Sequence, residues 1–232
     1  MNNGTVSGGT GWNGAAGGGN NASGVIIASS GATVINNASG TIQGGNTQGG
    51  YAGAGISITG TAAKPGAVIN YGTIRGGSDL TGVGTGNFAI RARGNGLTTI
   101  TNYGTLEGGN GAAAIGLESS TTWTVSLVNS GTIRAGAGST TAIQFGTSAT
   151  STSTLELQAG SQIFGNVIAG VAGTSDTLRL GGAGFAILDG AIGATGQYQN
   201  FDILEKTGSG TWALTADNTA TQAWTISQGT LQ

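Results

Sequence analysis

The side chains that usually perform enzyme chemistry are scarce in this sequence. It contains no His and no Cys, which excludes a Ser-His-Asp triad, a Cys-His dyad and any zinc site built from imidazole or thiolate ligands. The acidic residues are spread along the chain, and no two of them lie within two positions of each other. Hydrolysis by paired acids and calcium binding both need carboxylates that cluster. We therefore expect no enzyme activity, no metal site and no cofactor.

Charged and aromatic residues at repeating positions are the remaining candidates for function. Arg75, Glu107 and Arg134 each directly follow a Gly-Thr-aliphatic triplet, and their charges alternate. Tyr71 and Tyr103 each directly precede such a triplet. If the copies lie side by side, the charges form a ladder and the tyrosines stack. The ladder then either fixes the register through exposed ion pairs or presents a polar contact patch, and we favour the first interpretation. The tyrosines either cover a corner or act as binding anchors, and both interpretations stay open.

A long internal repeat must position these side chains. The triplet recurs with its glycine at Gly4, Gly40, Gly72, Gly104 and Gly131. An Asn stands two residues before the glycine in four copies, at Asn2, Asn70, Asn102 and Asn129. In the copy at Gly40, Asn37 is displaced by one residue, which predicts a bulge at that turn. Stacked Asn side chains can satisfy one another and the turn backbone, so we expect the Asn column to be structural.

Alternating apolar and polar residues in each copy predict short strands separated by glycine-rich turns. Such units cannot bury their apolar sides alone, but they can do so when stacked in register. The sequence therefore predicts an all-β, single-stranded parallel β-helix with about three short strands per coil. Three inward columns are expected. The first is Val6, Ile42, Ile74, Leu106 and Ile133; the second is Ile56, Ile58, Ile90, Ala92, Ile115, Leu117, Ile143 and Phe145; the third is Ile35, Val68, Ile100 and Leu127. In the same register, Arg93 and Glu118 are expected to lie in phase on neighbouring coils, as a second part of the polar ladder or contact patch.

The last third of the chain differs from the rest. We divide the sequence into regular coils at 1–150 and aromatic-rich coils at 151–232, the second continuous with the first. The inward candidates there are Leu155, Leu157, Leu178, Leu180, Trp212, Leu214, Trp224 and Ile226. Because aromatic side chains bury more area than Val or Ile, we expect this end to be the more stable one.

Composition and charge exclude several partners. The net charge is −2, so no basic field is present to hold nucleic acid. No apolar run approaches the roughly 18 residues of a spanning helix, so we expect no direct membrane insertion. The start, MNNGTVSGG, lacks the basic and apolar regions of a secretory signal peptide.

The chain resembles the passenger domains of Gram-negative autotransporters. The resemblance covers essentially the whole chain and rests on the N-Y/S-G-T-I/L coils, on LELQAGSQIFGNV, and above all on DTLRLGG, YQNFDILEKTGSGTWALTADNT and WTISQGTLQ. It implies type V secretion, a right-handed β-helix displayed on the cell surface or secreted, and a following outer-membrane β-barrel that we expect to be missing from residues 1–232.

Two functions remain in view. The first is an adhesin or self-association module that meets host-cell or neighbouring-cell surface molecules, or a second copy of itself. The alternative is a structural stalk whose carboxy-terminal coils nucleate folding for a distal functional region. Unpaired strand edges at both ends also predict end-to-end association in solution.

Overall fold

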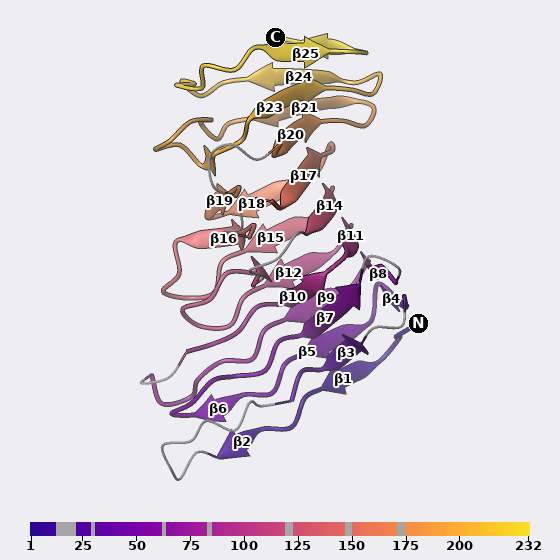
Figure 1. The fold of residues 1–232 in the computed structure, drawn as a ribbon, viewed down its shortest axis with the longest axis vertical. Coiled ribbons are helices and arrows are strands. Elements are labelled where there is room, and N and C mark those ends of the chain that lie inside the picture. The colour runs from indigo at the N-terminus through magenta and orange to yellow at the C-terminus, as the bar shows by residue number, and fades with distance from the viewer. Residues whose placement is uncertain are drawn as a thin grey trace.

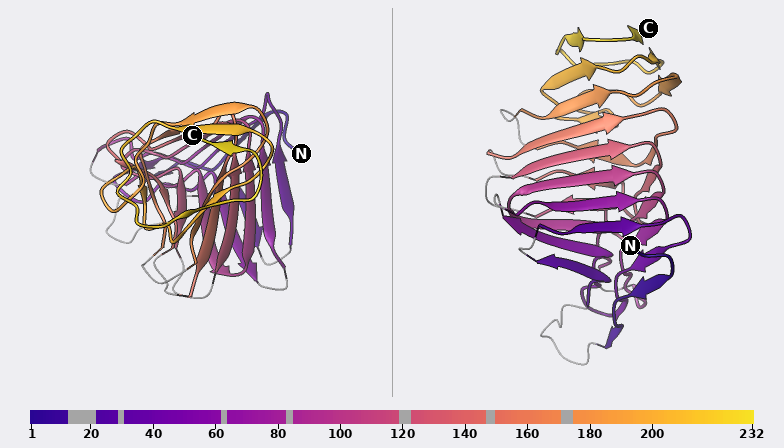
Figure 2. Two further views of the ribbon diagram at one scale, coloured as in Figure 1. Left: turned by 90° about the horizontal axis from the view of Figure 1, so that it is seen from above. Right: turned by 90° about the vertical axis from the view of Figure 1, so that its right-hand side faces the viewer.

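The protein is built from short strands joined by turns and loops (Figure 1). The computed structural model describes residues 1–12, 22–28, 31–61, 64–82, 85–118, 123–146, 150–170 and 175–232. Within these ranges the regular elements are all strands, and no helix occurs. Figure 2 shows the strands layered one above another along the long axis of the molecule, with the carboxy terminus at one end.

Three parallel sheets form the walls of the solenoid. The eight-stranded sheet contains β4 (Thr33–Asn36), β8 (Gly66–Asn70), β11 (Leu97–Asn102), β14 (Thr124–Asn129), β17 (Thr152–Leu157), β20 (Thr177–Leu180), β23 (Ile203–Lys206) and β25 (Trp224–Ile226). The six-stranded sheet contains β1 (Thr5–Ser7), β5 (Thr41–Gln43), β9 (Thr73–Arg75), β12 (Thr105–Glu107), β15 (Thr132–Arg134) and β18 (Gln162–Phe164). The seven-stranded sheet contains β3 (Val25–Ala28), β7 (Ile56–Thr61), β10 (Ile90–Asn95), β13 (Ile115–Leu117), β16 (Thr141–Gln144), β19 (Asn166–Ile168) and β22 (Tyr198–Gln199).

Two smaller parallel sheets complete the fold. One pairs β2 (Gly11–Trp12) with β6 (Thr47–Gln48), and the other contains β21 (Phe185–Leu188), β24 (Thr211–Leu214) and β26 (Thr230–Leu231). A single coil, such as β8, β9 and β10, therefore places one strand in each of the three long sheets. This confirms the predicted all-β parallel β-helix with three short strands per coil.

Columns of identical or similar aliphatic side chains fill the interior. Ile42, Ile74, Leu106 and Ile133 pair in register along the six-stranded sheet, and each is fully buried. The predicted column on the seven-stranded sheet is buried as well, from Ile56 to Phe145. Because burying one such side chain is worth about 1.5–3 kcal/mol relative to leaving it exposed, these columns dominate the stability of the fold.

A ladder of asparagine side chains lines the turn between the eight-stranded and six-stranded sheets. Each side-chain amide donates to the Oδ1 atom of the next Asn at 2.8 Å, in the order Asn2, Asn36, Asn70, Asn102 and Asn129. The Asn102 amide also donates to the carbonyl oxygens of Gly104 and Thr132, both at 3.2 Å. The last four members are completely buried, so the ladder satisfies turn carbonyls that water does not reach.

The ladder corrects the prediction made for Asn37. The side chain that joins the column is Asn36, which lies opposite Asn70. Counting back from Gly40 gave the wrong residue because this turn is longer than the others: three residues separate Asn36 from Gly40, whereas one separates Asn70 from Gly72. The extra residues are accommodated in the turn, so the strand itself has no bulge.

The same miscount made the prediction for Ile35 wrong. Val34 pairs with Val68 and packs against the core, whereas Ile35 pairs with Ile69. Alternation within the strand, counted back from Asn36, places Val34 on the inner face.

Substitution of a central ladder residue tests this arrangement. We expect Asn102→Ala to lower the free energy of unfolding by about 2–4 kcal/mol, because it leaves buried partners on both neighbouring coils unpaired. Urea denaturation followed by circular dichroism measures the change. Asn2→Ala is the matched control, since Asn2 is only half-buried and lies at the end of the ladder. Equal losses for the two variants would show that the ladder contributes nothing beyond local turn bonds.

The eight-stranded sheet runs across residue 150, where the sequence pattern changes. Strand β17 pairs with β14 on one side and with β20 on the other. The six-stranded sheet instead ends at β18, and β21 begins the separate three-stranded sheet. Here the side-chain amide of Gln197 donates to the carbonyl oxygens of Ile163 at 2.9 Å and Gly165 at 3.1 Å. A glutamine side chain thus replaces part of the missing strand pairing.

Most inward predictions for the last third are confirmed. Leu155, Leu157, Leu178, Leu180 and Trp212 are buried. The prediction that Ile226 is buried is wrong, because 53 % of this residue is exposed.

The reason for the exposure of Ile226 lies in its place in the sheet. Ile226 pairs in register with the buried Lys206, so it lies on the inner face of the sheet. However, β25 is the last strand of the eight-stranded sheet, and one side of it is uncovered. Trp224 on the same strand is half-buried for this reason.

Candidate contact surface

The two predicted tyrosines stack on each other at the surface. Tyr71 and Tyr103 follow successive members of the Asn ladder, which fixes both turns in the same conformation. Their ring centroids lie 4.9 Å apart, and the ring planes differ by 9°. Tyr71 is 47 % exposed and Tyr103 is 48 % exposed. The pair therefore presents a rigid aromatic surface with two phenol groups to solvent.

The charged column lies beside this pair on the outer face of the six-stranded sheet. Arg75, Glu107 and Arg134 pair in register on β9, β12 and β15, as the sequence predicts. The Arg75 Nε atom lies 3.1 Å from a Glu107 carboxylate oxygen. The guanidinium of Arg134 lies over the ring of Phe164, 4.1 Å from its centroid. Exposed ion pairs of this kind contribute at most about 1 kcal/mol. The side chains of Arg75 and Glu107 remain 53 % and 33 % exposed.

Phe164 extends the column and was not among the predicted site residues. It lies opposite Arg134 on the neighbouring strand and is 45 % exposed. Its place in register with the charged residues was a usable signal, but the loss of the Gly-Thr motif in this copy hid it. We define the contact face as Tyr71, Tyr103, Arg75, Glu107, Arg134 and Phe164.

The structure places the other predicted pair on a different wall. Arg93 and Glu118 belong to the seven-stranded sheet and its margin, and Arg93 donates to the Oε2 atom of Glu118 from Nε at 3.0 Å and from Nη2 at 2.8 Å. Arg91 donates to the same oxygen from Nε at 2.7 Å and from Nη2 at 2.5 Å. Arg91 was missed because its partner in register is Gly116, which carries no charge. The predicted residues therefore form two separate surfaces.

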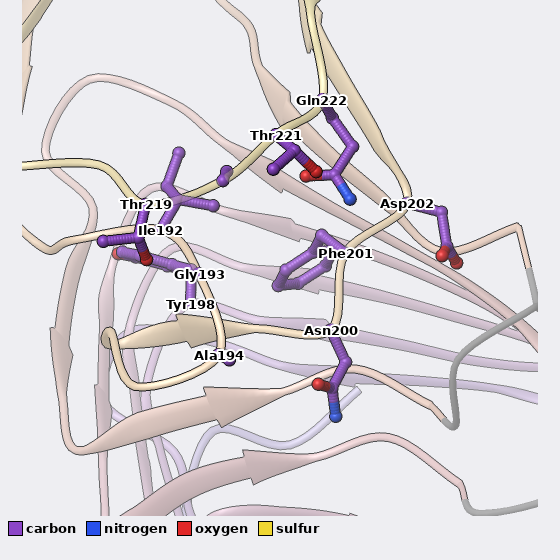
Figure 3. A pocket seen from close by; sticks show the side chains of 11 residues that line it. Ile192, Gly193, Ala194, Tyr198, Asn200, Phe201, Asp202, Thr219, Thr221 and Gln222 are labelled. Atoms are coloured by element: carbon purple, nitrogen blue, oxygen red, sulfur yellow. The ribbon is translucent and has the colours of Figure 1, made fainter.

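Figure 3 shows a hollow in the carboxy-terminal coils, where residues 192–202 face residues 219–222. Its volume is about 280 Å³, and its lining holds a single charged side chain, Asp202. That carboxylate accepts the backbone N–H of Asp176 at 3.2 Å. Burial raises the pKa of the Tyr198 phenol well above its ordinary value, and the Asp189 carboxylate raises it further. The hollow therefore holds one hydrogen-bonded carboxylate and one phenol that stays protonated at neutral pH.

Lys206 is a buried cation that sequence reasoning missed. It is completely buried, and its Nζ atom donates to the carbonyl oxygens of Thr207 at 2.6 Å, Gly208 at 2.9 Å and Gln228 at 3.1 Å. Burial lowers the pKa of this amine below its ordinary value. The signal was present, because Lys206 stands two residues after Leu204 on the inward face. It joins two successive coils through their turns.

The described ranges lack two further features. They contain no group of three or more His, Cys, Asp or Glu side chains placed to hold a metal ion. They also contain no helix with the length and apolar character needed to cross a membrane.

These features define a class of protein: a parallel β-solenoid with polar and aromatic columns on its outer walls. Residues 204–232 match the family described as Passenger-associated-transport-repeat. No curated protein and no solved structure matches the chain. The repeat match and the β-solenoid together fit an autotransporter passenger region. A passenger region is exported to the cell surface or secreted.

Proposed function

We propose that this passenger region is an adhesin or self-association module, and that the contact face is its binding surface. The observation that carries the proposal is the stacked pair of half-exposed tyrosines beside a column of charged side chains. Large aromatic side chains with a polar tip are the residues that most often dominate binding energy at protein interfaces. Here they are held rigid by the buried Asn ladder, so little conformational entropy is lost when a partner binds.

Two kinds of partner fit this surface. One is a molecule on a host or neighbouring cell, and the other is the contact face of a second copy. The alternation of Arg75, Glu107 and Arg134 makes the face compatible with an antiparallel copy of itself that is offset by one coil, because Glu107 of each copy then meets Arg134 of the other. Self-association is therefore the first property to measure.

The test uses the purified chain coated on beads, with bead aggregation and adhesion to cultured cells as the two measurements. We expect Tyr71→Ala/Tyr103→Ala to weaken the apparent affinity by about tenfold or more, because truncating a central aromatic anchor costs at least about 2 kcal/mol. Leu80→Ala is the control, since Leu80 is also exposed but lies outside the contact face. Unchanged aggregation and adhesion in the double variant would refute the proposed surface.

Light scattering separates lateral from end-to-end association. An oligomer that disappears in the double tyrosine variant is held by the contact face. An oligomer that persists in it is instead explained by pairing between the uncovered end strands, such as β25.

The second candidate is a stalk whose carboxy-terminal coils nucleate folding. It is supported by the position of the transport-repeat match and by the buried aromatic residues Tyr198, Phe201 and Trp212 near that end. A stalk predicts neither bead aggregation nor cell adhesion by the wild-type chain. It also predicts that core substitutions near residue 212 slow refolding, which the adhesin proposal does not require.

A further inference from the structure

A polar groove lies on the outer face of the seven-stranded sheet, away from the contact face. Its volume is about 580 Å³, and Arg91, Arg93 and Glu118 are among the residues that line it. A second, smaller hollow on the preceding coils shares Arg91 and Arg93. The two arginines therefore stand between two neighbouring depressions that follow each other along the solenoid.

A glycine makes room for an aromatic floor in this groove. Gly116 occupies the outward position between Arg91 on β10 and Gln144 on β16. A Cβ atom built at Gly116 would lie 2.2 Å from a ring carbon of Phe88, so the ring of Phe88 covers the glycine. Tyr51, which is 63 % exposed, also lines the groove. The groove thus offers aromatic ring surface together with amide and guanidinium groups.

The groove carries a net positive charge in a chain whose net charge is −2. Arg91 and Arg93 both donate from Nε and Nη2 to the single oxygen Oε2 of Glu118, at 2.5–3.0 Å. One carboxylate therefore faces two guanidinium groups, and among the described residues no other acidic side chain lines the groove. A guanidinium has five N–H donors, so each arginine retains donors beyond those that Glu118 uses.

We propose that this groove binds an acidic oligosaccharide. The carboxylate or sulfate group of one sugar would pair with Arg91 and Arg93, while the apolar C–H face of a neighbouring ring would pack on Phe88 or Tyr51. The groove adjoins the second hollow at Arg91 and Arg93, and two adjoining depressions suit a linear chain of sugars. An extended peptide fits less well, because β10, β13 and β16 are all paired here and expose no backbone edge for strand addition.

Calorimetric titration of the full chain with three probes tests the proposal. They are a hyaluronan hexasaccharide, which carries carboxylates, a heparin hexasaccharide, which adds sulfates, and neutral maltohexaose. We expect both acidic probes to bind and the neutral one not to bind, and the ratio of the two acidic affinities identifies the preferred acid. Binding of maltohexaose with equal affinity, or no binding of either acidic probe, would overturn it.

Three substitutions assign the binding to this groove. Arg91→Gln/Arg93→Gln should weaken acidic-probe binding by about tenfold or more, since it removes the charged donors. Glu118→Gln should strengthen binding severalfold, because it removes the competing carboxylate and leaves both arginines. Lys64→Gln should have no effect on binding. It removes one positive charge, as each arginine substitution does, but Lys64 is exposed and lies outside the groove.

The outcomes are distinct from those for the contact face. Equal weakening by Lys64→Gln and by the arginine variant would show a general charge effect and refute the site. Tighter binding of a hexaglutamate peptide than of either saccharide would also refute it, in favour of an acidic peptide. Tyr71 and Tyr103 lie on another wall. We therefore expect the Tyr71→Ala/Tyr103→Ala variant to lose bead aggregation but to bind the saccharides as the wild type does. Unchanged thermal unfolding of Glu118→Gln confirms that its gain in affinity is not a folding effect.

Discussion

Gly104→Ala should lower the free energy of unfolding by about 3 kcal/mol or more, because a single added methyl group has no room between two coils. A Cβ atom at Gly104 would lie 2.1 Å from the carbonyl oxygen of Gly72 and 2.6 Å from the carbonyl carbon of Tyr71. Both are backbone atoms, so no side-chain rotation relieves the clash. The same contact recurs at Gly131, whose Cβ would lie 2.2 Å from the Gly104 oxygen.

Gly4→Ala is the matched control for this substitution. Gly4 precedes Thr5 as Gly104 precedes Thr105, but nothing lies within 4 Å of its added Cβ. Both variants lose the same backbone freedom in the unfolded chain, an effect of about 0.4–1 kcal/mol in favour of the folded state. The difference between the two denaturation midpoints therefore isolates the clash. Equal midpoints would mean that the coils separate easily and that the Gly column is not a packing constraint.

Trp212→Ala is expected to have the second large effect, a loss of about 3–5 kcal/mol. Trp212 is 3 % exposed, and its Nε1 atom donates to the carbonyl oxygen of Gly181 at 3.0 Å. The substitution leaves a cavity and also removes the partner of a buried carbonyl, which adds to the cost. Guanidinium denaturation followed by circular dichroism measures the change, and limited proteolysis shows whether the carboxy-terminal coils open first.

Three further variants calibrate the effect of Trp212→Ala. Trp212→Phe keeps most of the ring and loses the hydrogen bond, so its effect should be smaller. Trp224→Ala should also cost less, because Trp224 is half-buried on the last strand. Tyr71→Ala, at the surface, should change stability by less than about 1 kcal/mol. If Tyr71→Ala destabilises the chain as much as Trp212→Ala, the carboxy-terminal coils do not form a stability core.

The spacing of residues along the chain is enough to predict the repeating architecture. Each coil pairs with a copy of itself, so a residue that recurs in the repeat must contact its own counterpart. For this reason the aliphatic columns, the Asn ladder, the stacking of Tyr71 on Tyr103 and the register of Arg75 with Glu107 could all be predicted from spacing alone. The glycine before each threonine also recurs in the sequence. Only the structure explains why no other residue fits there, since a Cβ atom at Gly104 would lie 2.1 Å from the carbonyl oxygen of Gly72.

The features that do not repeat depend on contacts that form only in the folded chain. A longer turn placed Asn36 in the ladder and Val34 in the core, because strand pairing holds the register and lets the turn absorb the extra residues. At the end of the six-stranded sheet, the Gln197 side chain substitutes for strand pairing that the sequence pattern suggested would continue. Lys206 is tolerated inside the solenoid because three turn carbonyls converge on its ammonium group.

The groove on the seven-stranded sheet is the clearest product of tertiary structure. Its parts come from two neighbouring coils: Phe88 and Arg91 belong to one, Gly116 and Glu118 belong to the next, and the ring of Phe88 covers Gly116. None of these residues recurs at the same position in the repeat. Spacing along the chain predicts that Arg93 and Glu118 meet, as they do, but it carries no information about the addition of Arg91 and Phe88 to this site.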